Sequence, residues 1–293
     1  MKQITITSPE KIQNPNISVL PAEQITVASE STSCNPDYIG PDGLLYCGSC
    51  RTPKEAYNEK FEKLTGRPAH PIMCHCQAEE NEKEQLLAKQ REHEMTVSRL
   101  RMLCFPAKEM YNWTFENSQV DSEEIDKIRK YADNWEEAFR KNNGLLLWGS
   151  LGTGKTYAAA CIANALLEKA VSVRMTSFPR IANDLFGNEE KTEYLMELCS
   201  VSLLIIDDFG AERKTDYMLE TMWQVLELRA GFHKPLIVTT NLTLKELHDP
   251  SDDNIGRIYD RILALCAPLN ICLTNLRENL AQEQLQHLMK LVK

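Results

Sequence analysis

The sequence predicts an α/β fold in which helices cover both faces of a parallel sheet, preceded by a small cysteine-rich domain. From about residue 105 onward, short apolar runs alternate with longer stretches of helical composition, which is typical of buried parallel sheets. A glycine-rich segment directly follows the first of these runs. Two close pairs of cysteines stand before residue 77, in a region poor in core-forming residues.

Composition restricts the class of protein. The chain has 293 residues, which is enough for one large domain and a small one. Its net charge of −9 argues against non-specific coating of DNA by the whole surface, although it is compatible with a local basic groove. The polar N-terminus lacks the apolar segment of a signal peptide, and no apolar run approaches the roughly 20 residues of a membrane helix. We therefore expect a cytoplasmic protein without membrane contact.

Changes in composition divide the chain into four regions. Residues 1–40 are rich in Ser, Thr, Asn and Pro, and we expect a flexible arm there. Residues 41–76 hold the cysteine pairs but few core formers, so this small domain needs a staple to fold. Residues 77–104 are rich in Glu, Lys and Gln and free of Gly and Pro, which predicts a linker helix. Residues 105–293 form the domain that contains the sheet.

Five apolar runs of this last domain are the expected strands. They are GLLLWG (144–149), VSVRMT (171–176), SLLIIDD (202–208), PLIVTTN (235–241) and NICLTN (270–275). Helix-like stretches such as TYAAACIANALLEKA (156–170) lie between them. Strands that alternate with helices in this way predict parallel pairing.

The first strand leads into GSLGTGKT, which matches the phosphate-binding pattern G-x-x-x-x-G-K-[ST] between a strand and a helix. Glycines let backbone N–H groups approach phosphates, and the helix N-terminus adds a favourable field. Lys155 would reach the β- and γ-phosphates, and the Thr156 hydroxyl would bind Mg²⁺. The expected nucleotide-binding residues are Gly149, Ser150, Leu151, Gly152, Thr153, Gly154, Lys155 and Thr156.

Polar residues follow two other expected strands. Asp207 comes after four apolar residues, as a Walker-B aspartate does, and is expected to hold Mg²⁺. Asp208 is expected to polarise the attacking water, and Asn241 to orient it. Adjacent acids at a strand end are also common helix N-caps, so this interpretation depends on the phosphate-binding loop.

Arg257 and Arg261 lie four residues apart, on one face of an expected helix. Such arginines often form surface ion pairs. In a ring-forming ATPase, one of them would instead complete the active site of the neighbouring subunit. The local sequence leaves both interpretations open.

The paired cysteines suggest a metal site, a redox dithiol or disulfides. A chain without a secretion signal should keep its thiols reduced, and a redox Cys-x-x-Cys should open a helix in a βαβ setting that is missing here. Two close pairs in a segment too poor in core to fold favour a tetrahedral Zn²⁺ site. Its expected ligands are Cys47, Cys50, Cys74 and Cys76, with His70, His75 or Cys34 as alternatives for one of them.

Several motifs together resemble the AAA+ ATPases of the bacterial helicase-loader type (DnaC/DnaI), which are closely related to the IstB transposition helpers. These motifs are LLLWGSLGTGKT, LLIIDDFGAER, PLIVTTNL and RIYDRI, in this order, preceded by MYNWTFEN and YADNWEEAF. The resemblance covers roughly residues 105–280. It implies a five-stranded sheet with a nucleotide at the subunit interface.

The resemblance also implies roles for single residues. Asn241 matches sensor 1, Arg261 matches the arginine finger, and Arg277 lies where the family carries its sensor 2 arginine. The segment TSFPRIANDLFGNEE (176–190) corresponds to a helical insertion that faces single-stranded DNA. Arg174 and Arg180 are the phosphate contacts considered there, with a solvated helix as the alternative.

The expected function is ATP-dependent loading of a replicative DNA helicase onto single-stranded DNA during replication initiation. The N-terminal domain would bind the helicase, and the ATPase domains would self-associate. Hydrolysis is expected to be slow and dependent on assembly, with ATP, Mg²⁺ and Zn²⁺ as the bound groups. The alternatives are an IstB-type transposition helper and a non-catalytic, zinc-stabilised replication adaptor.

Overall fold

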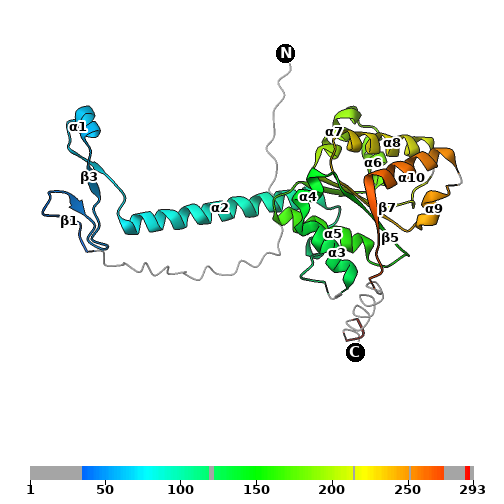
Figure 1. Cartoon of the computed structure of the whole chain (residues 1–293), viewed down its shortest axis with the longest axis horizontal. Helices are drawn as coiled ribbons and strands as arrows, with labels where there is room; N and C mark the ends of the chain where they lie inside the picture. The colour runs from blue at the N-terminus through cyan, green and yellow to red at the C-terminus, as the bar shows by residue number, and fades with distance from the viewer. Residues whose placement is uncertain (1–34, 119–121, 214, 251, 274–287, 291–293) are drawn as a thin grey trace, which may run out of the picture. The chain divides into compact units, whose positions relative to one another are not determined.

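The computed structural model describes residues 35–118, 122–213, 215–250, 252–273 and 288–290 (Figure 1). The chain divides into two compact units, Met1–Glu84 and Gln85–Lys293. Most of the arm predicted for residues 1–40 lies outside the described residues, whereas Tyr38 and Ile39 form a strand of the first unit. Among the residues that the structure describes, no helix combines the length and the apolar character that crossing a bilayer requires.

The first unit contains two small antiparallel sheets and a short helix, α1 (Glu59–Thr65). The paired strands are β1 (Tyr38–Ile39) with β2 (Leu45–Tyr46), and β3 (Glu55–Tyr57) with β4 (Ala69–Pro71). In the described part of this unit, the buried apolar side chains are those of Leu44, Cys47 and Cys74. Such a core is too small to hold a fold without a further staple.

The long helix α2 (His75–Cys104) begins two residues before the predicted linker helix and ends where the sequence predicts. It starts in the first unit and ends in the second. Only Val97 and Cys104 are buried along its 30 residues, in agreement with its charged composition. Its last turns are fixed within the second unit, where Arg101 pairs with Glu168 and the Leu103 carbonyl accepts a hydrogen bond from Arg174.

The second unit contains a five-stranded sheet in the order β6-β7-β8-β5-β9, and every pairing in it is parallel. The predicted fold class is therefore confirmed. The strands are β5 (Gly144–Trp148), β6 (Val173–Thr176), β7 (Leu203–Phe209), β8 (Leu236–Thr240) and β9 (Cys266–Asn270). The described helices are η1 (Lys108–Asn112), α3 (Glu123–Asp133), α4 (Trp135–Arg140), α5 (Lys155–Glu168), α6 (Phe178–Leu185), α7 (Lys191–Ser200), α8 (Asp216–Gly231), α9 (Leu244–His248) and α10 (Asp253–Leu265).

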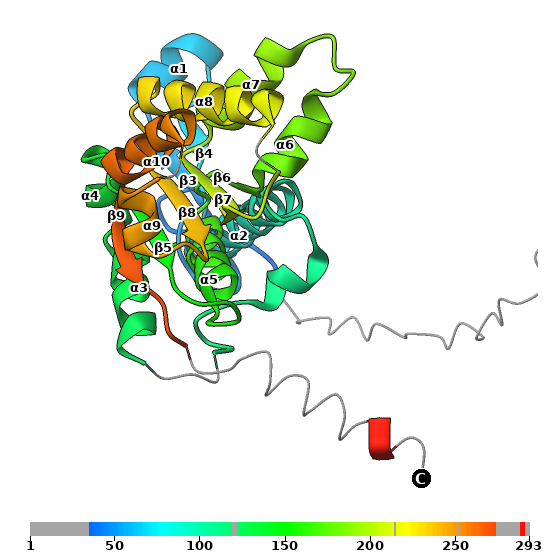
Figure 2. The ribbon, with the colours of Figure 1, turned by 90° about the vertical axis from the view of Figure 1, so that its right-hand side faces the viewer.

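Helices cover both faces of this sheet, and each face has its own apolar core (Figure 2). Alternate residues of one strand serve the two cores, because successive side chains of a strand point to opposite faces. In β7, Leu203 and Ile205 pack with α3 and α5, whereas Leu204 and Ile206 pack with α6, α7, α8 and α10. This double burial explains the near-continuous apolar strands of the sequence.

The position predicted for the fifth strand was wrong. The strand comprises residues 266–270, with Pro268 inside it, instead of 270–275. Within the described sheet, β9 is an edge strand that pairs with β5, and an edge strand tolerates a proline. The apolar run that suggested a strand is buried for another reason: Ile271 and Leu273 pack into the core, and their N–H groups donate to Trp148 O and Thr153 O. Residues 274 and 275 lie outside the described part.

Candidate functional site

The predicted phosphate-binding loop connects β5 to α5 at the carboxyl edge of the sheet. Gly152 and Gly154 both have φ of 83°, a left-handed conformation that glycine adopts without a Cβ penalty. At Gly149 the constraint is space, because a Cβ there would lie 2.5 Å from the Ile271 carbonyl oxygen. Leu151 is 74% exposed at the tip of the loop. The glycine pattern thus serves a tight loop that ends at a helix N-terminus, the usual anion-binding arrangement.

Lys155 is buried inside this loop at the first position of α5. Its Nζ donates hydrogen bonds to Gly149 O at 3.0 Å and to Ser150 O at 2.7 Å. The ammonium group is therefore held at the loop backbone, beside the N–H groups that begin the helix. A cation and a helix N-terminus at one point favour a phosphate anion.

Asp207 of β7 contacts both the start of α5, which follows the loop, and the neighbouring strand β8. Its Oδ1 accepts a hydrogen bond from Thr156 Oγ1 at 2.9 Å and another from Thr239 Oγ1 at 2.7 Å. Burial raises the pKa of the Asp207 carboxyl above its usual value, while the hydroxyls of Thr239 and Thr156 act in the opposite direction. A half-buried carboxylate beside a threonine hydroxyl is a suitable donor set for Mg²⁺.

Asp208 and Asn241 form a second contact at the same edge. Asn241 Nδ2 donates to Asp208 Oδ1 at 3.0 Å, and both residues are exposed. Asp208 has φ of 58°, a left-handed conformation that is uncommon for a residue with a side chain. The Asp208 N–H donates to Thr239 Oγ1 at 2.9 Å. The structure therefore places Asp208 and Asn241 together, as the sequence predicts, and adds Thr239.

Thr239 is a residue that the sequence analysis missed. It belongs to VTTN (238–241), in which Asn241 was the predicted site residue. Thr239 stands two positions before Asn241, a spacing that places two side chains on the same face of a strand. That alternation is a usable signal. The decisive fact, that its hydroxyl contacts both acids, depends on the register between β7 and β8.

The two arginines of α10 have different surroundings. Arg261 Nη2 forms an ion pair with Glu227 Oε1 of α8 at 2.8 Å. Arg257 is exposed and lines a surface hollow with Asp216, Trp223 and Asn254. Both interpretations of these arginines thus stay open in a single chain. Arg277, the third arginine of interest, lies outside the described residues.

Two further arginines have structural contacts. Arg174, considered above as a phosphate contact, donates from Nη1 to Leu103 O at 2.8 Å and so binds the last turn of α2. Arg180 is exposed on α6. Arg229 of α8 is fully buried and its guanidinium donates to the carbonyls of four residues, Cys199, Val201, Ser202 and Pro235. Burial lowers the Arg229 pKa to about 10.

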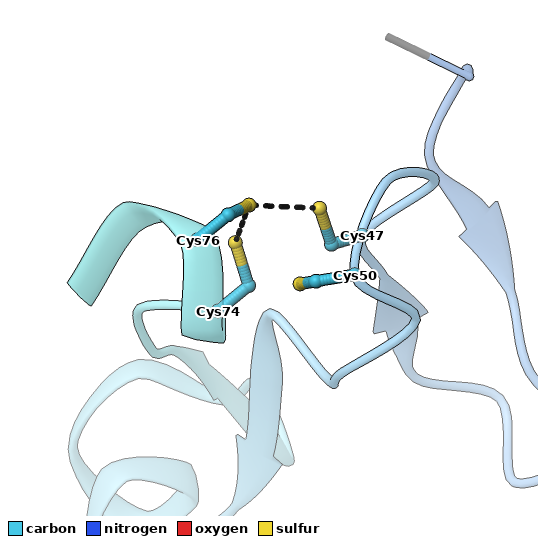
Figure 3. A group of neighbouring side chains, drawn as sticks. All are labelled: Cys47, Cys50, Cys74 and Cys76. Atoms are coloured by element: carbon cyan, nitrogen blue, oxygen red, sulfur yellow. Dashed lines mark hydrogen bonds between the residues drawn. The ribbon is translucent and has the colours of Figure 1, made fainter. Parts of the chain in front are cut away.

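The four predicted cysteines converge in the first unit (Figure 3). The sulfur atoms of Cys47, Cys50, Cys74 and Cys76 all lie within 4.8 Å of one another. Cys76 Sγ is 3.5 Å from Cys47 Sγ and 3.3 Å from Cys74 Sγ. Four sulfurs at these separations, from the turn after β2 and the start of α2, fit the Cys₄ ligand set of a structural zinc ion.

The pKa values of two of these thiols are shifted by hydrogen bonds to their close neighbours. A hydrogen bond from Thr52 lowers the pKa of Cys50 to about 5, whereas hydrogen bonding with Cys74 raises that of Cys76 to about 12. Neighbouring thiolates repel one another, so a cation is needed before all of them ionise.

Two of the alternative zinc ligands, His70 and His75, do not belong to this cluster. His75 is exposed and its Nδ1 lies 3.6 Å from Glu79 Oε1. The His70 ring packs against Phe61 in a tilted arrangement, with ring centroids 5.8 Å apart. Cys34 lies outside the described residues. In the part of the chain that the structure describes, the group of potential metal ligands consists of the four cysteines.

Comparisons with known proteins agree with this geometry. The model of the IstB-like ATP binding protein family matches residues 77–283. The replicative helicase loader DnaC of Escherichia coli K12 is 29% identical over 145 residues, 46% of this chain and 58% of that protein. The loader DnaI of Bacillus subtilis is 31% identical over 144 residues, 45% of this chain and 46% of that protein. The chain thus spans about half the length of these curated relatives.

A solved structure supports the fold alone. The crystal structure of DnaI superposes with a TM-score of 0.50 and 24% identity, covering 57% of this chain and 95% of that chain.

Proposed function

This chain belongs to the family of IstB-like ATP binding proteins, and from this premise we propose that it is an ATPase that loads a replicative DNA helicase onto single-stranded DNA. The observation that supports this most is the convergence of Lys155, Thr156 and Asp207 at one edge of the sheet. The similarity to the replicative helicase loaders DnaC and DnaI supports helicase loading as the role of this ATPase.

In this proposal, the loop from Gly149 to Thr156 binds the phosphates of ATP. Lys155 exchanges its loop carbonyls for phosphate oxygens, and the helix N-terminus supplies further donors. Thr156 and Asp207 hold Mg²⁺, which neutralises charge on the phosphates when bound. The residues fit this ion because an oxygen of each already lies within 2.9 Å of the other.

Hydrolysis is assigned to the neighbouring acid and amide. Asp208 polarises the attacking water, and Asn241, which holds the Asp208 carboxylate, orients that water at the same edge. Arg261 acts on the site of an adjacent subunit, after release from Glu227, and Arg277 contacts the nucleotide of its own subunit. Turnover is therefore slow for a lone chain and depends on assembly.

The N-terminal unit is assigned to helicase binding. Its four cysteines bind Zn²⁺, and this ion stabilises a unit whose own apolar core is minimal. Helix α2 connects the unit to the ATPase part. A cytoplasmic location stays a prediction.

Co-precipitation tests the helicase part of the proposal. The full chain, and a shortened chain that lacks residues 1–103, are each mixed with the replicative helicase encoded by the same genome, with ATP and Mg²⁺. We expect the full chain to retain the helicase and the shortened chain to lose it. Absence of a complex with the full chain contradicts the proposal.

A transposition helper is the second candidate, because the matching family model carries the IstB name. The same co-precipitation distinguishes the two when a transposase encoded beside this chain's gene replaces the helicase. Retention of the transposase in place of the helicase favours the second candidate. A non-catalytic adaptor would show no ATP turnover that depends on Lys155.

A further inference from the structure

Thr239 is a buried polar residue at the centre of the site. It is 1% exposed, and its single hydroxyl makes two hydrogen bonds to two adjacent acids. It donates to Asp207 Oδ1 at 2.7 Å and accepts from the Asp208 N–H at 2.9 Å. Since a hydroxyl has one proton, the two partners together fix its rotation.

An irregularity of the sheet explains why a side chain is needed here. Ile206 pairs with Val238, and the next pairing joins Phe209 to Thr240. Two residues of β7, the acids, therefore oppose one residue of β8, which is Thr239. In such a β-bulge the ladder is interrupted, and the extra residue lacks its usual backbone partner. The Asp208 N–H is satisfied by the Thr239 hydroxyl instead.

The bulge directs the two neighbouring carboxylates to different partners. Asp207 turns to Thr156, whereas Asp208 turns to Asn241. The left-handed φ of 58° at Asp208 carries a conformational cost, which surrounding contacts must offset. Thr239 provides one such contact at the backbone, and it also holds the Asp207 oxygen that Thr156 contacts.

We propose that Thr239 is a positioning residue, whose hydroxyl sets the orientation of the Asp207 carboxylate and of the Asp208 peptide for magnesium-dependent nucleotide binding. This inference rests on the proposed function, because it assumes a magnesium–nucleotide complex at Asp207. Thr239 acts through the acids and needs no contact of its own with the nucleotide.

Thr240 provides a matched control. It is the adjacent threonine, fully buried, and its hydroxyl donates to Phe209 O at 2.7 Å and accepts from the Leu242 N–H at 3.1 Å. Thr240→Val therefore removes a buried hydroxyl with two hydrogen bonds from the same strand, without removing a contact to either acid. Thr239→Val also removes a buried hydroxyl with two hydrogen bonds, but these two bonds are the contacts to Asp207 and Asp208.

The experiment measures binding of a fluorescent, non-hydrolysable ATP analogue to the full chain, in EDTA and in saturating Mg²⁺. The ratio of the two Kd values reports how much Mg²⁺ strengthens binding. Outer-shell partners of metal ligands typically contribute 10- to 100-fold to metal affinity, so Thr239→Val should reduce this ratio by about tenfold or more. Thr239→Ser should restore most of the ratio, and Thr240→Val should leave it within about twofold of wild type.

Two controls keep the result interpretable. Thermal melting without nucleotide compares the folding of all variants, and Thr239→Ala replaces the valine variant should that one fail to fold. Equal ratios for the valine variants at 239 and 240, or failure of Thr239→Ser to restore binding, overturn the positioning role alone. A wild-type chain whose binding is indifferent to Mg²⁺ overturns the proposed function, and this inference with it.

Discussion

Thr156 and Asp207 stand 51 positions apart in the sequence, yet the Thr156 hydroxyl donates to the Asp207 carboxylate at 2.9 Å. Thr156 lies in the first turn of α5, after the glycine-rich loop, and Asp207 lies near the end of strand β7. Parallel pairing brings both to one edge of the sheet, where ligands of open α/β sheets usually bind. This contact makes a single site out of two separate motifs, and the predictions for the ATPase part start from it.

Removal of the loop lysine should abolish nucleotide binding while the fold persists. Lys155→Ala removes the ammonium group held at the Gly149 and Ser150 carbonyls, and with it a charge that attracts the phosphates. We expect ATP turnover to fall by about 100-fold or more. The control is Lys191→Ala, at an exposed position of α7, which should keep wild-type turnover. A steady-state ATPase assay with single-stranded DNA checks both.

The proposed trans action of Arg261 predicts complementation between two inactive variants. Arg261→Ala keeps its own nucleotide loop, whereas Lys155→Ala keeps its arginine. A mixture of the two should therefore recover part of the turnover that each lacks alone, since one type of interface contains both groups. Arg257→Ala serves as the comparison, because Arg257 lies four residues away on the same helix. No recovery in the mixture would assign Arg261 to its ion pair with Glu227 alone.

Arg229 should be a major contributor to stability. Its buried guanidinium satisfies four carbonyl groups, and Arg229→Ala would leave them buried without donors. A buried acceptor that loses its donor costs about 1–3 kcal/mol, and because four carbonyls lose theirs we expect urea unfolding to show a loss of at least about 3 kcal/mol. Arg229→Lys should recover only part of it, since an ammonium group cannot reproduce the planar fork. Arg140→Ala, on an exposed residue of α4, should leave the free energy of unfolding nearly unchanged.

Zinc removal should affect the first unit selectively. Purified without chelator, the chain should contain one zinc ion, and Cys50→Ser should lower this content because one of four ligands is lost. Cys272→Ser is the matched control, since Cys272 is exposed and outside the cluster. Zinc competes with protons for sulfur, so zinc should be released on acidification. A zinc-selective chelator, added in excess Mg²⁺, should reduce helicase retention while binding of ATP persists; loss of both would contradict the separate roles of the two units.

The sequence predicted those parts of the site whose chemistry is local. The glycine-rich loop, the paired acids and Asn241 each follow an apolar strand, and strand ends of a parallel sheet converge. The cysteine pairs were likewise apparent. A metal site is the most direct explanation for two close pairs of cysteines in a segment that has too few apolar residues to form a core.

Other features depended on tertiary structure. β9 was misplaced because Pro268 reads as a breaker, although an edge strand accepts it. Thr239 was missed since its contacts arise from a bulge between β7 and β8, which no periodicity reveals. Arg174 was considered for DNA, yet the fold uses it to bind α2. An arginine that contacts DNA and an arginine that holds the end of a helix look alike in the sequence.

The most direct test of the central claim is loading of the cognate helicase onto circular single-stranded DNA. A ring-shaped helicase cannot thread onto a closed circle unaided, so co-elution of helicase and circle on gel filtration measures loading. We predict that co-elution requires this chain and ATP, and that Lys155→Ala abolishes it. Equal co-elution with and without this chain, or with Lys155→Ala in its place, would contradict the account.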